Sequence, residues 1–100
     1  YSTQDVIKSL ESGNTQSAQK AVLDIYNTKV ENKVAEGKTK KEADKSARSS
    51  IKSALTSEYK ARYVNGTASE RSKIQKMLKS IYINGKPLYE NKDFSPWLKD

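Results

Sequence analysis

The chain has 100 residues, enough for one domain with a small hydrophobic core but not for a deep internal pocket. Lys and Arg number 19 against 12 Asp and Glu, and the net charge of +7 favours anionic partners such as nucleic acid, acidic protein or a membrane surface. Cysteine and histidine are both absent, which excludes disulfides, thiolate nucleophiles and the commonest general base and metal ligand. We therefore expect no enzyme, no catalytic residue, no metal and no cofactor.

The first part of the chain predicts a short helix followed by a long one. Apolar residues recur at helical spacing over residues 3–12, and Gly13 stands where that helix would end. A second apolar face continues over residues 15–36, where Gly37 stops it. The side chains able to cap the two N-termini are Ser2 or Thr3 and Asn14 or Thr15.

A third helix is predicted between Gly37 and Gly66. Thr39 and Glu42 have the spacing of a capping box, in which the hydroxyl accepts from one unpaired amide and the carboxylate from another. The apolar residues that follow cover an arc of about 160° on a helical wheel, and this arc forms one face for a core. They are Ala43, Ala47, Ile51, Ala54, Leu55 and Tyr59.

A fourth helix has the most regular apolar spacing in the chain. It follows the stop signal at Asn65 and Gly66, and Thr67 with Glu70 predicts a second capping box. Its apolar residues recur every three or four positions without a polar interruption, so this face also belongs to the core. They are Ile74, Met77, Leu78, Ile81 and Tyr82.

The last part of the chain loses helical periodicity. Asn84-Gly85 predicts a loop, and Ser95-Pro96 predicts a short final helix, with serine as the N-cap and proline in the first turn. No segment shows the alternation of a β-strand. We therefore expect an all-α fold: a single domain over residues 1–100, with a small bundle of about four helices, short connections, and a C-terminal loop plus a short helix.

The ends of the chain carry no recognisable targeting segment. The N-terminus lacks the basic and then apolar pattern of a secretion signal, and no apolar run is long enough to cross a membrane. Tyr1 stands where a methionine would be expected, which predicts a fragment of a larger protein. A membrane partner is not expected.

Four cations of the third helix form a stripe beside its apolar face. Lys41, Lys45, Arg48 and Lys52 fall within about 60° of one another on a helical wheel. Such a stripe can lie along a phosphate backbone and displace its counterions, which makes these residues the candidate nucleic-acid contacts. A solvated helix face gives the same pattern, supported by spaced pairs such as Glu42 with Lys45. The sequence leaves both interpretations open.

Four aromatic residues are the candidate anchors for a protein partner: Phe94, Trp97, Tyr59 and Tyr63. Aromatic side chains provide large contact areas at protein interfaces. The two tyrosines, with Arg62 between them, also have the composition of a surface that stacks single-stranded nucleic acid. The alternative is that they form the edge of the core, while Phe94 and Trp97 close one end of the bundle.

Several of these segments resemble a helical module found in large bacteriophage proteins. The resemblance rests on the stretch GKTKKEADKSARSSIKSALTSEYKARYVNG, on the spacing of Ile74, Lys76 and Leu78, and on Phe94 with the closing WLKD. It covers residues 13–100. It implies a phage origin and a place inside a larger, virion-associated polypeptide, and it brings no catalytic residue pattern.

Two functions follow as expectations. The first is a non-catalytic structural or assembly module of a larger phage protein, which packs against other segments of the parent chain or against virion components. The second is a basic module that contacts nucleic acid through its lysine-rich face. The resemblance places such a module in the virion or in the host cytoplasm.

Overall fold

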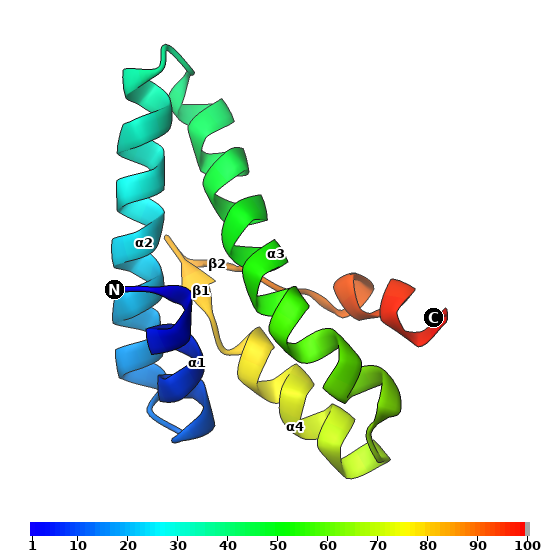
Figure 1. The fold of residues 1–100 in the computed structure, drawn as a ribbon. Helices are drawn as coiled ribbons and strands as arrows, with labels where there is room; N and C mark the ends of the chain where they lie inside the picture. The colour runs from blue at the N-terminus through cyan, green and yellow to red at the C-terminus, as the bar shows by residue number, and fades with distance from the viewer. Residues whose placement is uncertain (100) are drawn as a thin grey trace.

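Four α-helices make up most of the computed structural model, which describes residues 1–99 (Figure 1). The helices are α1 (Thr3–Glu11), α2 (Thr15–Ala35), α3 (Lys40–Asn65) and α4 (Ala68–Lys79). The C-terminal part contains the strands β1 (Tyr82–Ile83) and β2 (Lys86–Pro87) and the 3-10 helices η1 (Asn91–Phe94) and η2 (Pro96–Lys99). The expected all-α bundle with a short C-terminal helix is confirmed.

Side-chain caps fix where α1 and α3 begin. The Thr39 hydroxyl accepts from the amide of Glu42 at 3.1 Å, and the Glu42 carboxylate accepts from the amide of Thr39 at 3.0 Å. Ser2 and Asp5 make the same reciprocal pair at the start of α1. Both boxes satisfy amides that a helix N-terminus leaves without partners. The capping box expected for α3 is confirmed.

The second expected capping box, at the start of α4, is only half formed. The Thr67 hydroxyl accepts from the amide of Glu70 at 3.2 Å, but the Glu70 carboxylate binds the Arg62 guanidinium at 3.2 Å instead of returning to Thr67. A charge-assisted bond to a guanidinium is stronger than a bond to a neutral amide. Arg62 thereby ties the end of α3 to the start of α4.

A β-hairpin stands where the sequence predicted the end of α4 and a loop. The helix stops at Lys79, and the pairs Tyr82–Pro87 and Ile83–Lys86 face each other in an antiparallel ladder. Asn84 and Gly85 both have positive φ, +52° and +81°, as the two central residues of a type I′ turn require. The expectation of no strand was therefore wrong for these residues.

The core lies between α1, α2, α3 and α4 and continues into the C-terminal segment. Ile74, Leu78 and Ile81 are fully buried, as their spacing predicted. The remaining helices contribute Val6, Leu10, Ala18, Ala21, Val22, Tyr26, Ile51, Leu55, Tyr59 and Tyr63. None of the described helices combines the length and the apolarity that a membrane span requires.

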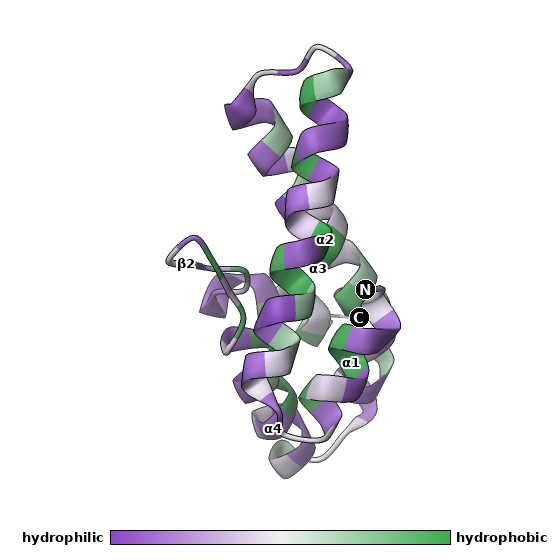
Figure 2. Cartoon of the chain, turned by 90° about the vertical axis from the view of Figure 1, so that its left-hand side faces the viewer, coloured by the Kyte–Doolittle hydropathy of each residue, from purple (hydrophilic) through white to green (hydrophobic). Residues whose placement is uncertain are grey.

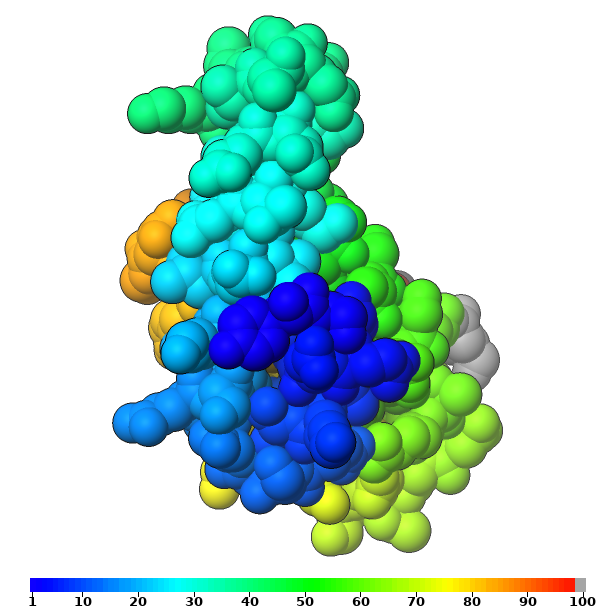
Figure 3. All heavy atoms as spheres, turned by 60° about the vertical axis from the view of Figure 1, so that its left-hand side comes forward, coloured from blue at the N-terminus to red at the C-terminus, as the bar shows by residue number. Residues whose placement is uncertain are grey.

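The upper ends of α2 and α3 project from this core as an arm, residues 27–46 (Figures 1 and 3). The arm makes the molecule elongated, with extents of 44 × 29 × 21 Å. The buried Ala43 lies on the α3 side of the arm and Ala47 lies at its base, and such small side chains allow two helices to pack closely. Residues of the arm are mostly hydrophilic, with single hydrophobic residues between them (Figure 2). Much of the arm surface is thus open to solvent.

Candidate functional site

The structure divides the predicted cationic stripe into two halves. Lys41 and Lys45 are exposed and make no ion pair within the described residues, whereas Arg48 and Lys52 are half-buried and bound to other parts of the chain. An exposed cation can neutralise a phosphate, but a cation already paired with a carboxylate contributes little. Only half of the stripe therefore has the properties of a nucleic-acid contact.

Arg48 holds the β-hairpin against the base of the arm. Its Nε donates to Asp44 Oδ1 at 3.0 Å and its Nη2 to the carbonyl of Ile83 at 2.6 Å, while the Tyr26 hydroxyl donates to the same Asp44 oxygen. The Tyr26 hydrogen bond, and then the Arg48 guanidinium, hold the pKa of Asp44 below its ordinary value. Burial is the main cause that raises the pKa of Tyr26. Arg48 is thus a structural residue in this fold.

Lys52 fastens η1 to α3. Its Nζ lies 3.2 Å from Asp93 Oδ1 and 5.7 Å from the centre of the Tyr89 ring. The Tyr89 hydroxyl in turn donates to the Lys52 carbonyl at 2.7 Å, and burial raises the pKa of Tyr89 to about 12. Arg48 and Lys52 thus differ from the other two predicted nucleic-acid contacts, because both side chains already bind other parts of the fold.

A groove of about 420 Å³ runs between α3, the hairpin and η1, and we call it the α3–hairpin groove. Its lining combines the stripe residues Lys45, Arg48 and Lys52 with two further cations, Lys86 and Lys92. The other lining residues are Asp44, Ser49, Pro87, Leu88, Glu90 and Asp93. Helical periodicity could not predict that Lys86 and Lys45 line the same groove, because the position of Lys86 depends on the hairpin. The sequence signal for that hairpin was Asn84-Gly85.

The charges in this groove are unequally matched. Each of its three carboxylates has a cationic partner; these pairs are Asp44 with Arg48, Asp93 with Lys52, and Glu90 with Lys92 at 3.5 Å. Lys45 and Lys86 make no ion pair within the described residues, although Lys86 is close enough to Asp44 to help lower its pKa. The excess positive charge of the groove thus comes from two lysines on opposite walls.

The four predicted partner anchors all lie inside the core. Tyr59, Tyr63, Phe94 and Trp97 are each at most 5% exposed. The Trp97 ring meets those of Tyr63 and Phe94 at steep angles, with centroids 5.2 and 5.1 Å apart. Such edge-to-face pairs stabilise a core beyond the effect of burial alone. The assignment as partner anchors is corrected: all four rings belong to the core, where Tyr63, Phe94 and Trp97 join the C-terminal segment to α3 and the Tyr59 hydroxyl donates to Glu11 of α1.

Other apolar side chains do reach the surface. Leu23 and Val34 on α2 are each 41% exposed, and Tyr82 on β1 is 48% exposed. Sequence periodicity placed Tyr82 on the core face of the fourth helix, and this was wrong because the helix ends at Lys79 and Tyr82 belongs to the hairpin. Val34 lies on the arm, and Leu23 lies about one helical turn before its start on α2.

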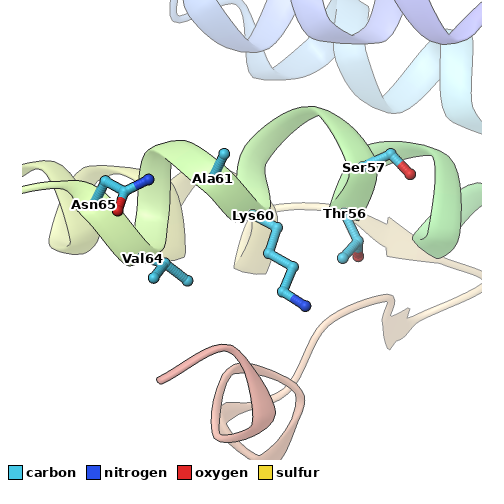
Figure 4. A pocket seen from close by; sticks show the side chains of 6 residues that line it. All are labelled: Thr56, Ser57, Lys60, Ala61, Val64 and Asn65. Atoms are coloured by element: carbon cyan, nitrogen blue, oxygen red, sulfur yellow. The ribbon is translucent and has the colours of Figure 1, made fainter. Parts of the chain in front are cut away.

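Two features that would support catalysis are missing from the described residues. No three acidic side chains gather there in a cluster that could hold a metal ion. A depression of about 540 Å³ lies along one side of α3, and Figure 4 shows its described lining side chains leaving that single helix. Catalytic and small-molecule sites usually surround a ligand with groups from several elements. This depression is open and has no such convergence.

Comparison with family models, with curated proteins and with solved structures finds no match to this chain.

Proposed function

We propose that this chain is a non-catalytic helical module of a larger phage protein and that it works by packing against neighbouring protein. The observation that carries the proposal is an exposed apolar row along the arm and its base, formed by Leu23, Val30 and Val34, which we call the arm row. The resemblance to helical phage modules supports a neighbour in the same polypeptide or in the virion. Nothing in this role requires a cofactor.

The arm row has the geometry of a helix-docking surface. Positions 23, 30 and 34 fall within about 40° of one another on a helical wheel, so the three side chains follow one line along α2. Leu23 and Val34 remain 41% exposed, and Val30 is half-buried at the edge of the core. Covering such side chains is worth roughly 1.5–3 kcal/mol each when they pass from full exposure to full burial. Because these side chains are only partly exposed, a partner that covers them would gain part of this free energy.

The hairpin extends this surface at its lower end. The amide of Tyr82 donates to Gln19 Oε1 at 2.7 Å, and Gln19 lies one helical turn before Leu23. The backbone of Tyr82, whose side chain is exposed, is therefore attached to α2 near the start of the arm row. Tyrosine is favoured at protein interfaces because its ring is apolar and its hydroxyl can still bond.

Cross-linking of the parent polypeptide in its native assembly tests this function. A lysine-reactive reagent should link the arm lysines Lys33, Lys38 and Lys41 to other protein segments, and Leu23→Gln with Val34→Gln should remove most of those links. Leu98→Gln is the control, because Leu98 is 56% exposed but lies far along the chain in η2. Links confined to this module, or links unchanged in the double variant, would contradict packing through the arm row.

A further inference from the structure

We propose that the α3–hairpin groove binds the phosphodiester backbone of nucleic acid without reading its sequence, through Lys41, Lys45 and Lys86. This surface is separate from the arm row, so the inference goes beyond packing against protein. Lys45 and Lys86 face the groove from α3 and from β2. Lys41 precedes Lys45 by one helical turn, which continues the positive edge by about 6 Å along α3.

The distribution of charge in the α3–hairpin groove favours binding of an anion. The three carboxylates of the groove are paired with Arg48, Lys52 and Lys92, which leaves the charges of Lys45 and Lys86 in excess, although Asp44 also attracts Lys86. Lys41, Lys45 and Lys86 are exposed and carry no ion pair within the described residues. Their ammonium groups are surrounded by counterions in solution, and a polyanion that displaces these ions gains free energy.

The three residues suit an anion that needs no directional fork. Lysine binds phosphate as a point charge, whereas bidentate recognition of a carboxylate or a phosphate relies on the planar fork of arginine. The arginine of this groove, Arg48, is already engaged by Asp44 and by the Ile83 carbonyl. The carboxylates of an acidic peptide would therefore find lysines in this groove but no free guanidinium.

The hairpin also offers a peptide backbone little to pair with. Its outer strand β2 has two residues, Lys86 and Pro87, and proline has no N–H to donate. A peptide that adds a strand to an open edge depends on such main-chain hydrogen bonds. A phosphodiester chain needs none of them.

The lining of the groove offers little for the recognition of bases. Direct readout relies on forks such as that of arginine, and single-strand readout relies on exposed aromatic rings on which bases stack. Arg48 is engaged, and the Tyr89 ring beneath Lys52 is buried. Binding should therefore be independent of sequence and weak, with about three phosphates neutralised.

Fluorescence anisotropy with a short labelled DNA duplex of mixed sequence tests the groove. For three phosphates the logarithm of the binding constant should fall against the logarithm of salt with a slope of about −2.7, which is about 40-fold weaker binding between about 50 and 200 mM salt. Lys45→Gln with Lys86→Gln should weaken binding more than about tenfold at the lower salt and reduce the slope to about −0.9.

Lys20→Gln with Lys76→Gln is the matched control, because it removes the same net charge from exposed sites on α2 and α4. Equal weakening in both double variants would show that net charge alone attracts DNA and would overturn the site. Absence of binding at low salt, or tighter binding of a labelled polyglutamate peptide than of DNA, would overturn it too. Leu23→Gln with Val34→Gln should leave DNA binding unchanged, so either proposal can fail without the other.

Discussion

Tyr26 on α2 and Asp44 on α3 are joined by a hydrogen bond of 2.5 Å from the phenol to the carboxylate. The same carboxylate oxygen accepts from Arg48, whose guanidinium reaches the carbonyl of Ile83 in the hairpin. Tyr26 and Arg48 thus meet at one oxygen atom at the base of the arm, and Arg48 connects this contact to the hairpin. The contact fixes where the arm begins and also sets the wall of the α3–hairpin groove.

Tyr26→Phe should therefore destabilise the protein without emptying the core. The variant keeps the buried ring but removes the donor to Asp44, and a net loss of about 1 kcal/mol is expected, because the carboxylate is partly exposed and keeps its arginine partner. Urea unfolding followed by circular dichroism measures the change. Tyr82→Phe is the control, since Tyr82 is about half exposed, and it should change stability by less than about 0.5 kcal/mol. Equal effects of the two substitutions would argue against a structural bond at Tyr26.

Acid should weaken the fold through Glu11 and Asp44. The hydrogen bond from Arg62 holds the pKa of Glu11 below its ordinary value of 4.5, and the one from Tyr26 holds that of Asp44 below 3.8. A carboxyl with a lowered folded-state pKa stabilises the protein above its ordinary pKa, and this stabilisation is lost as the pH falls through the lowered value. Urea midpoints should therefore decrease from about pH 5 towards pH 2.

The variant Glu11→Gln isolates one of these contributions. It cannot gain or lose a proton, so its stability should fall less steeply in acid than that of the unchanged protein, although it is less stable at neutral pH. Glu31→Gln serves as the comparison, because Glu31 is exposed and makes no ion pair within the described residues. Identical acid profiles for Glu11→Gln and the unchanged protein would contradict the Arg62 assignment.

Phe94→Ala should release the C-terminal segment from α3. Phe94 packs against Tyr63, Tyr89 and Trp97, with ring centroids between 5.1 and 5.6 Å away. Truncation of a buried phenylalanine costs about 3–5 kcal/mol. Trp97 is the single tryptophan, so its fluorescence reports the change directly, and its emission should move to longer wavelength as water reaches the ring.

Tyr82→Ala provides the matched truncation of an exposed aromatic residue. It should cost less than about 1 kcal/mol and leave the Trp97 emission unchanged. If Phe94→Ala left both stability and emission as they were, the four aromatic rings would not form one cluster in solution.

Local sequence signals were enough to predict most of the helical architecture. The Thr39–Glu42 capping box, the stop at Gly66 and the spacing of Ile74, Leu78 and Ile81 all concern neighbours within one or two helical turns. Such interactions depend mainly on nearby residues, although the full Thr67–Glu70 box and the longer fourth helix were wrong, because Arg62 and the hairpin intervene. The four helices and the buried face of α4 were therefore predictable.

The candidate site could be predicted only in part, because its residues meet across long separations. Arg48 and Lys52 fit the stripe, but their partners Ile83 and Asp93 lie 35 and 41 residues further along the chain. A helical wheel cannot show that such a cation is already engaged. The Asn84-Gly85 hairpin was the missed signal, and it would have brought Lys86 to the stripe.

Ala43 and Ala47 carry a consequence for how the arm tolerates substitution. Larger side chains at these two positions would push the paired helices apart, so they restrict what the arm can accept. The outward-facing positions around them bear no such restriction, since changes on a solvated helix surface usually cost little. The helix pairing of the arm thus tolerates few changes at its buried alanines, whereas its solvated surface can vary in chemistry without a change of fold.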